Sequence, residues 1–114
     1  MRKKYHIVST AYDKGGNVIS RGYNQYTKSN TWQKELSLLA GLSEERIFLH
    51  SEVSCLIRAR NLGKKVHTLK IERYGVDNSP KIAFPCKSCQ IAIKLSGVKK
   101  VIFTTDEGFS EWLV

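Results

Sequence analysis

The pattern of apolar and polar positions divides the chain into strand-like, loop-like and helix-like segments. Residues 5–12 and 17–23 are rich in β-forming residue types, and residues 13–16 between them (Asp-Lys-Gly-Gly) tolerate the positive φ of a tight turn. This pattern predicts a β-hairpin. Residues 25–30 are polar and show no apolar periodicity, so we expect a loop after the hairpin.

Three further segments have the apolar spacing of helices. A helix is predicted over residues 32–40, with Thr31 as its N-cap, and two more over residues 51–61 and 87–96. A glycine follows each segment closely, as is typical of helix C-termini. In the second and third helices the aliphatic residues fall on one face, which indicates packing against a sheet.

Two more strands are expected, over residues 66–74 and 99–105. The turn-rich stretch 75–80 follows the first of them, and the second carries a nearly continuous apolar run, typical of a strand covered on both faces. Helices and strands alternate from residue 47 onward, which predicts an α/β fold with a mixed sheet and both later helices on one face. No element is predicted in the tail, 106–114, and the length fits a single domain over residues 1–114.

Two short motifs carry the candidate chemistry. His50 and Glu52 form an H-x-E pair, and Pro85, Cys86 and Cys89 form P-C-x-x-C. One imidazole and two thiolates are three ligands for a tetrahedral Zn²⁺ and leave the fourth position for water, as in catalytic zinc sites. Glu52 is then available to transfer protons. This pair of motifs is typical of zinc-dependent nucleobase deaminases.

The predicted elements bring the two motifs together. His50 falls at the start of one helix, and Cys86 and Cys89 at the start of another, so two positive helix ends converge and favour thiolates. Two other interpretations exist. The cysteines could be a redox pair of the thioredoxin kind, and Glu52 could be a first-turn carboxylate favoured only by the helix dipole. Cys55 lies off the metal-facing side and is expected to be a small buried apolar residue.

At these residues the chain resembles the cytidine deaminase superfamily, and most of all its nucleotide-type branch and the compact deaminases of bacteriophages. The resemblance extends from the hairpin to about Thr105 and implies a cytidine-deaminase-like fold. It implies that His50, Cys86 and Cys89 bind one zinc ion per chain and that Glu52 is the proton shuttle.

The resemblance also implies substrate contacts. Residues 22–24 resemble the G-x-N of the nucleotide-type branch, so Asn24 would contact the sugar, although a turn residue is an equal alternative. The backbone at Ser51 would meet the base, Pro85 would set the cysteine loop, and the carbonyl of Phe84 would face the departing amine. The family usually has Ala at the position of Ser51. The chain is also shortened at both ends of the fold, since only nine residues follow Thr105.

Composition and charge indicate the kind of partner and the cellular compartment. The formal charge of +9 on 114 residues favours a polyanionic or phosphorylated partner. Three cysteines do not form a disulfide framework, and thiolate ligands require a reducing compartment, so we expect a cytoplasmic protein. No stretch is apolar for long enough to cross a membrane, and the basic start lacks the apolar run of a signal peptide.

Four functions remain open from the sequence. The first is hydrolytic deamination of cytosine in a free nucleoside or nucleotide, and the second is the same reaction on single-stranded DNA or RNA. Adenine deamination in RNA is third, and a non-catalytic zinc module that binds nucleic acid is fourth. A shortened fold should expose apolar surface near residues 101–103 and at Phe109, Trp112 and Leu113, so a homo-oligomer is predicted.

Overall fold

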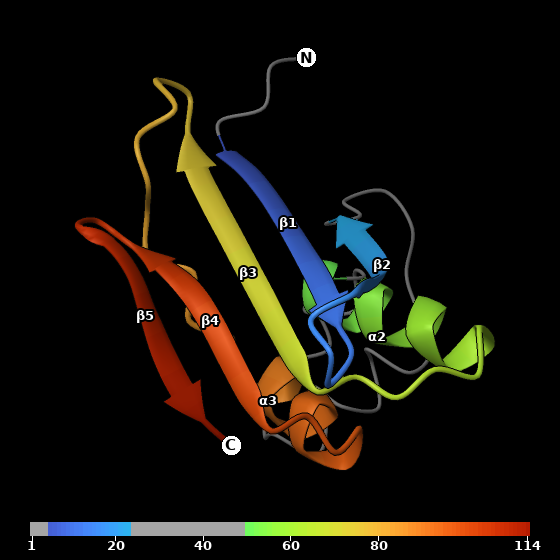
Figure 1. Ribbon diagram of the computed structural model, residues 1–114. Coiled ribbons are helices and arrows are strands. Elements are labelled where there is room, and N and C mark those ends of the chain that lie inside the picture. The colour runs from blue at the N-terminus through green and yellow to red at the C-terminus, as the bar shows by residue number, and fades with distance from the viewer. Residues whose placement is uncertain (1–4, 24–49) are drawn as a thin grey trace.

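The computed structural model describes residues 5–23 and 50–114. Within these residues, five strands form one mixed sheet in the order β2-β1-β3-β4-β5, accompanied by two helices (Figure 1). The helices are α2, Ser51–Asn61, and α3, Lys87–Leu95. The strands are β1 (Tyr5–Tyr12), β2 (Val18–Tyr23), β3 (Thr68–Gly75), β4 (Lys100–Thr105) and β5 (Gly108–Leu113).

The opening hairpin is confirmed. β1 and β2 pair antiparallel, and the backbone N–H of Asp13 donates to the carbonyl of Asn17 at 2.9 Å across the turn. The Asp13 carboxylate accepts a further hydrogen bond from the Asn17 backbone N–H at 2.9 Å. Gly16 has φ 85°, a conformation that glycine adopts without strain.

The pairing of β1 with β3 builds the floor of the candidate site. In this antiparallel register Ile7 lies opposite Arg73 and Ser9 lies opposite Ile71. Residues directly opposite one another point to the same face of a sheet, and every second residue of a strand shares that face. These four side chains therefore lie on one face, although the two strands are far apart in the sequence.

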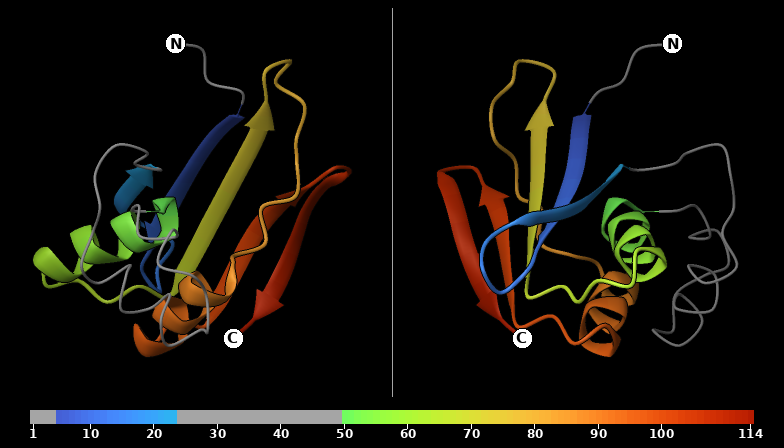
Figure 2. Two further views of the ribbon diagram at one scale, coloured as in Figure 1. Left: turned by 180° about the vertical axis from the view of Figure 1, so that it is seen from behind. Right: turned by 45° about the vertical axis from the view of Figure 1, so that its right-hand side comes forward.

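Both helices lie on the same face of the sheet (Figure 2). β3 and β4 run parallel, so the chain between them crosses over the sheet, and α3 is part of this crossover. Gly63 and Gly97 follow the two helices with φ 69° and 76°, as the glycine stops predict. The core lies between helices and sheet and includes Val53, Leu56, Leu69, Ile71, Ala92, Ile93 and Val101.

The C-terminal tail differs from the expectation, because it forms β5 and pairs antiparallel with β4. Its residues are mostly exposed, so they lack the apolar alternation by which strands are detected. Val101 and Phe103 are 0% and 8% exposed and Ile102 is half-buried, so none of these three residues forms the exposed apolar surface that was expected. Phe109 and Leu113 are exposed, as expected, whereas Trp112 is half-buried and packs against the core.

Two other expectations concern helices. The helix predicted over residues 32–40 lies outside the described residues. In the described part of the chain, no helix combines the length and the apolar character needed to cross a membrane.

Candidate active site

The N-termini of the two helices meet, and this places the predicted metal ligands together. His50 and Cys86 occupy the N-cap positions of α2 and α3, both with extended backbone. Cys89 follows three residues after Cys86, which puts it on the same side of α3. His50 Nδ1 lies 3.2 Å from Cys89 Sγ and 3.5 Å from Cys86 Sγ. The three ligand atoms all lie within 4.8 Å of one another.

This donor set fits zinc. Bonds of about 2.0–2.1 Å to nitrogen and about 2.3 Å to sulfur place the nitrogen and sulfur ligands of a tetrahedral site about 3.5 Å apart. The distances from His50 Nδ1 to the two sulfurs are close to this value. Three protein ligands leave one tetrahedral position open, and Glu52 is not a member of the group. The arrangement therefore suits a catalytic zinc better than a structural one.

The pKa values of the two cysteine thiols are shifted in opposite directions. The hydrogen bond from Cys89 lowers the pKa of Cys86 to about 3, and hydrogen bonds from His50 and Ser88 act in the same direction. The pKa of Cys89 lies well above its ordinary value because its proton is held in the bond to Cys86 and because it is buried. Both sulfurs must be thiolates to bind a metal, so zinc binding releases a proton from Cys89.

Glu52 lies in the first turn of α2 and is 7% exposed. Burial raises the pKa of this carboxyl group, and a hydrogen bond of 2.9 Å from Ser51 Oγ to its Oε1 opposes that shift. Glu52 lines a hollow of about 290 Å³ that opens beside the metal ligands. The hollow is lined by Ile7, His50, Glu52, Ile71, Arg73, Ile82, Ala83, Phe84 and Cys86.

The other predicted site residues have different placements. Phe84 lines the hollow, and Pro85 is buried, with its carbonyl accepting a hydrogen bond from Gln90 Nε2 at 2.9 Å. Ser51 is fully buried behind Glu52. Asn24 lies outside the described residues. The roles assigned to the Phe84 carbonyl, the Ser51 backbone and Asn24 stay predictions.

Arg73 is a residue of the site that no sequence motif indicated. Arg73 lines the hollow, and its Nη1 donates a hydrogen bond to the carbonyl of Ile82 at 3.2 Å. The alternation of side chains along a strand gives one indication of its place. Arg73 comes two residues after buried Ile71 and therefore points to the same face of the sheet. Without the pairing of β3 with β1, that face could not be assigned to the catalytic side.

β5 also contributes to the site through Trp112. The ring of Phe84 packs against the rings of Trp112 and Phe103, at centroid distances of 5.4 and 5.2 Å. Aromatic contacts of this kind add to the stabilisation from burial alone. The tail strand therefore helps to fix the residue that precedes Pro85 and the zinc loop.

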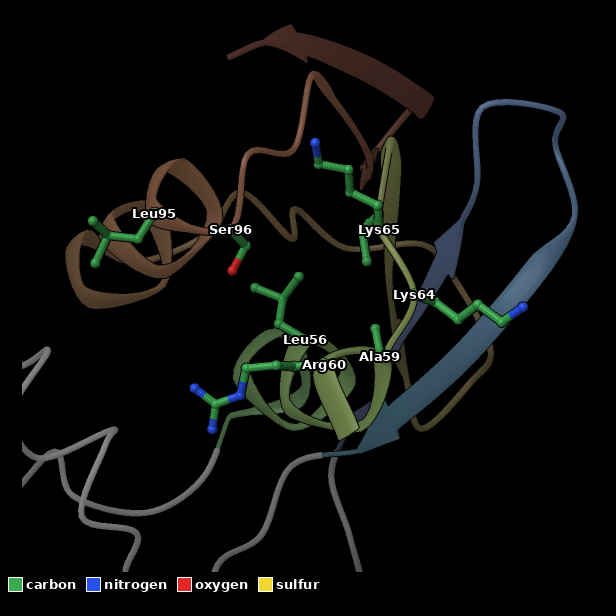
Figure 3. Close-up of a pocket in the computed structure, with 8 residues that line it drawn as sticks. Leu56, Ala59, Arg60, Lys64, Lys65, Leu95 and Ser96 are labelled. Atoms are coloured by element: carbon green, nitrogen blue, oxygen red, sulfur yellow. The ribbon is translucent and has the colours of Figure 1, made fainter. Parts of the chain in front are cut away.

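A second hollow, of about 380 Å³, lies at the other ends of the two helices (Figure 3). Figure 3 shows its cationic side chains pointing in different directions, with the ends of Arg60 and Lys64 directed away from each other. Leu56 and Ser96 point toward its centre. The residues that line it include no carboxyl, thiol or imidazole group, so the candidate site remains the one at the helix N-termini.

Comparison with known proteins identifies the family. Residues 2–105 match the family described as the cytidine and deoxycytidylate deaminase zinc-binding region. The chain belongs to this family. The match supports zinc as the cofactor of the deaminase site formed by His50, Cys86 and Cys89. No match was found among curated protein sequences.

Two solved structures share the fold of this family member. Cytidine deaminase from Mycobacterium leprae aligns with a TM-score of 0.56 and 15% identity, covering 94% of this chain and 74% of that one. A point mutant of cytidine deaminase from Mycobacterium tuberculosis aligns with a TM-score of 0.53 and 15% identity, covering 87% and 66% of the two chains. The predicted α/β fold is confirmed, and the chain is shorter than both proteins.

Proposed function

We propose that this protein is a zinc-dependent hydrolase that deaminates cytosine to uracil in a free nucleotide or nucleoside. One observation carries the proposal: a nitrogen and two sulfur ligands converge at two helix N-termini, beside a buried carboxyl group that is not a member of the metal-binding group. A redox pair would not need Glu52, and a structural zinc would need a fourth protein ligand. The use of thiolate ligands also favours a reducing compartment, such as the cytoplasm.

The reaction assigns proton transfer to Glu52. Zinc bound by His50, Cys86 and Cys89 would lower the pKa of water to about 7 and so make hydroxide available at neutral pH. Glu52 accepts the proton that water loses and delivers it to N3 of the cytosine ring, while the oxygen bonds to C4. Glu52 then takes the second proton from the oxygen now bonded to C4 and delivers it to the amine on C4, and ammonia leaves. One water is consumed and one ammonia is released for each uracil formed.

The walls of the hollow suit a flat base. Ile7, Ile71 and Ile82 contribute apolar residues to these walls, and Phe84, which is 44% exposed, contributes an aromatic one. Apolar walls orient a base and exclude water, while a few polar groups select its edge. We assign the amine-facing contact to the Phe84 carbonyl and the sugar contact to Asn24.

Arg73 favours a nucleotide over a nucleoside. Its guanidinium belongs to the wall of the same hollow as Glu52, and its hydrogen bond to Ile82 ties it to the loop that leads to the zinc ligands. A guanidinium binds phosphate oxygens through charge-assisted hydrogen bonds, often in pairs. A single phosphate can use this one cation, whereas a polynucleotide would need many.

A substrate panel tests the proposal. Turnover of deoxycytidine, its monophosphate and a short cytosine-containing single strand is measured at low and at physiological salt. We expect the monophosphate to react fastest, and its turnover should fall only mildly as the salt concentration rises. Arg73→Gln should reduce the preference for monophosphate over nucleoside by about tenfold, and Arg73→Lys should retain part of it. If only the single strand is deaminated, and its turnover falls steeply as the salt concentration rises, the polynucleotide reaction is favoured instead.

A further inference from the structure

Two buried serines form a chain of hydrogen bonds that ends on Glu52. Ser9 of β1 and Ser51 of α2 are both 0% exposed, and their Oγ atoms lie 2.9 Å apart. Ser51 Oγ donates to Glu52 Oε1, also at 2.9 Å. A serine hydroxyl can donate one hydrogen bond, and Ser51 uses its single donor in the bond to the carboxyl group. The hydroxyl of Ser9 is therefore the donor to Ser51, and both bonds point toward Glu52.

These two hydrogen bonds both act on one oxygen of the Glu52 carboxyl group. We infer that Ser9 and Ser51 are positioning residues that hold Glu52 Oε1 from behind and leave Oε2 to exchange protons with water and substrate. The inference rests on the proposed function of Glu52. A hydroxyl that itself accepts a hydrogen bond becomes a stronger donor, so Ser9 strengthens the bond that Ser51 makes to the carboxylate.

Packing alone does not account for these hydroxyl groups. Ser9 lies opposite Ile71 on the helix-covered face of the sheet, where an alanine would fill almost the same space. A buried hydroxyl costs free energy unless it is hydrogen-bonded, and here each one is bonded toward the catalytic carboxyl group. Ser20 of β2 shows the other case, because its hydroxyl donates to the backbone carbonyl of Cys55 and only joins β2 to α2.

The test compares four variants with the wild type: Ser51→Ala, Ser9→Ala, the double variant and Ser20→Ala. For Ser51→Ala we expect kcat to fall about tenfold with KM and zinc content unchanged, since a hydrogen bond to a charged group is lost. Ser9→Ala should lower kcat about threefold, and the double variant should be no slower than Ser51→Ala. Ser20→Ala removes a comparable buried hydroxyl and should lower the melting temperature without lowering kcat.

A carbon-13 spectrum of the zinc-loaded protein gives a readout that does not need turnover. The Glu52 carboxyl resonance is assigned as the one lost in Glu52→Gln. It should move in Ser51→Ala, move less in Ser9→Ala and stay in place in Ser20→Ala. The inference is overturned if the resonance stays in place in all three variants, or if kcat of Ser51→Ala lies within about twofold of an active wild type. If the wild type is inactive but the resonance moves as expected, the proposed function is overturned and the positioning of Glu52 by Ser9 and Ser51 is supported.

Discussion

Glu52 is the residue that separates a deaminase from a zinc-binding module with the same three ligands. Replacing it by Gln keeps the shape and the hydrogen bond from Ser51 but removes the group that moves protons. We expect turnover of Glu52→Gln to fall by about 10²–10⁴-fold, with zinc content unchanged by metal analysis. Glu72→Gln is the matched control, because Glu72 accepts a hydrogen bond from Tyr74 at 2.7 Å and does not line the hollow. Activity of Glu52→Gln above about a tenth of wild type would contradict the assigned mechanism.

Cys86 gives a second test at the scale of one residue. The pKa of its thiol is lowered to about 3, chiefly by the hydrogen bond from Cys89, so in the metal-free protein Cys86 is a thiolate throughout the range of pH 5 to 7. We expect iodoacetamide to modify Cys86 at a rate that hardly changes across this range. Burial raises the pKa of Cys55, which should remain unmodified. Peptide mapping by mass spectrometry measures both residues.

The control for this labelling is zinc itself. A metal held by Cys86 should protect it from iodoacetamide, and removal of the metal with a chelator should restore labelling. A rate that rises about tenfold for each pH unit, as for an ordinary thiol of pKa about 8.5, would contradict the geometry of the pair.

At the scale of elements, the sequence was most informative where periodicity and stop signals agreed. α2 and α3 begin where predicted, and their glycine stops lie just beyond their ends. The hairpin was predictable from its turn residues. β5 was not, because its strand conformation depends on pairing with β4 and its exposed residues do not alternate.

The residues of the candidate site also fall into two groups, those that the sequence indicated and those that it did not. The metal ligands and Glu52 lie in two local motifs, so the sequence alone indicated them. Arg73 and Ser9 reach the site through strand pairing, and Ser9 bonds to Ser51 across 42 residues. No local pattern reports a contact of that range, since a one-residue change of register would turn both side chains to the other face.

Gly22 tests how closely β2 approaches α2. A Cβ at this position would overlap the carbonyl oxygen of Ser51 and the backbone nitrogen of Cys55. Backbone atoms cannot move aside, so we expect Gly22→Ala to destabilise the protein by about 1–3 kcal/mol and to disturb the start of α2. Gly15→Ala is the control, because a Cβ there would meet only the side chains of Asp13 and Asn17 in the turn and no backbone atom. Denaturant unfolding of both variants measures the difference, and equal stability would contradict the close approach.

At the scale of the whole molecule, the exposed edge of the sheet predicts self-association. β5 is an edge strand, and its Phe109 and Leu113 are 54% and 75% exposed. Edge strands with exposed apolar side chains readily pair with another chain. We expect a homo-oligomer by light scattering at both low and high salt, and Leu113→Lys should weaken it. A monomer of 13.0 kDa at high concentration would contradict this prediction.

The most direct test of the central claim follows oxygen, ammonia and zinc in one reaction. Protein with one zinc per chain is incubated with deoxycytidine monophosphate in heavy-oxygen water, before and after metal removal by a chelator. We predict deoxyuridine monophosphate carrying one oxygen from the solvent, an equal amount of ammonia, loss of activity with the metal and recovery when zinc is restored. Failure to convert any cytosine substrate, or conversion that persists without zinc, would contradict the account.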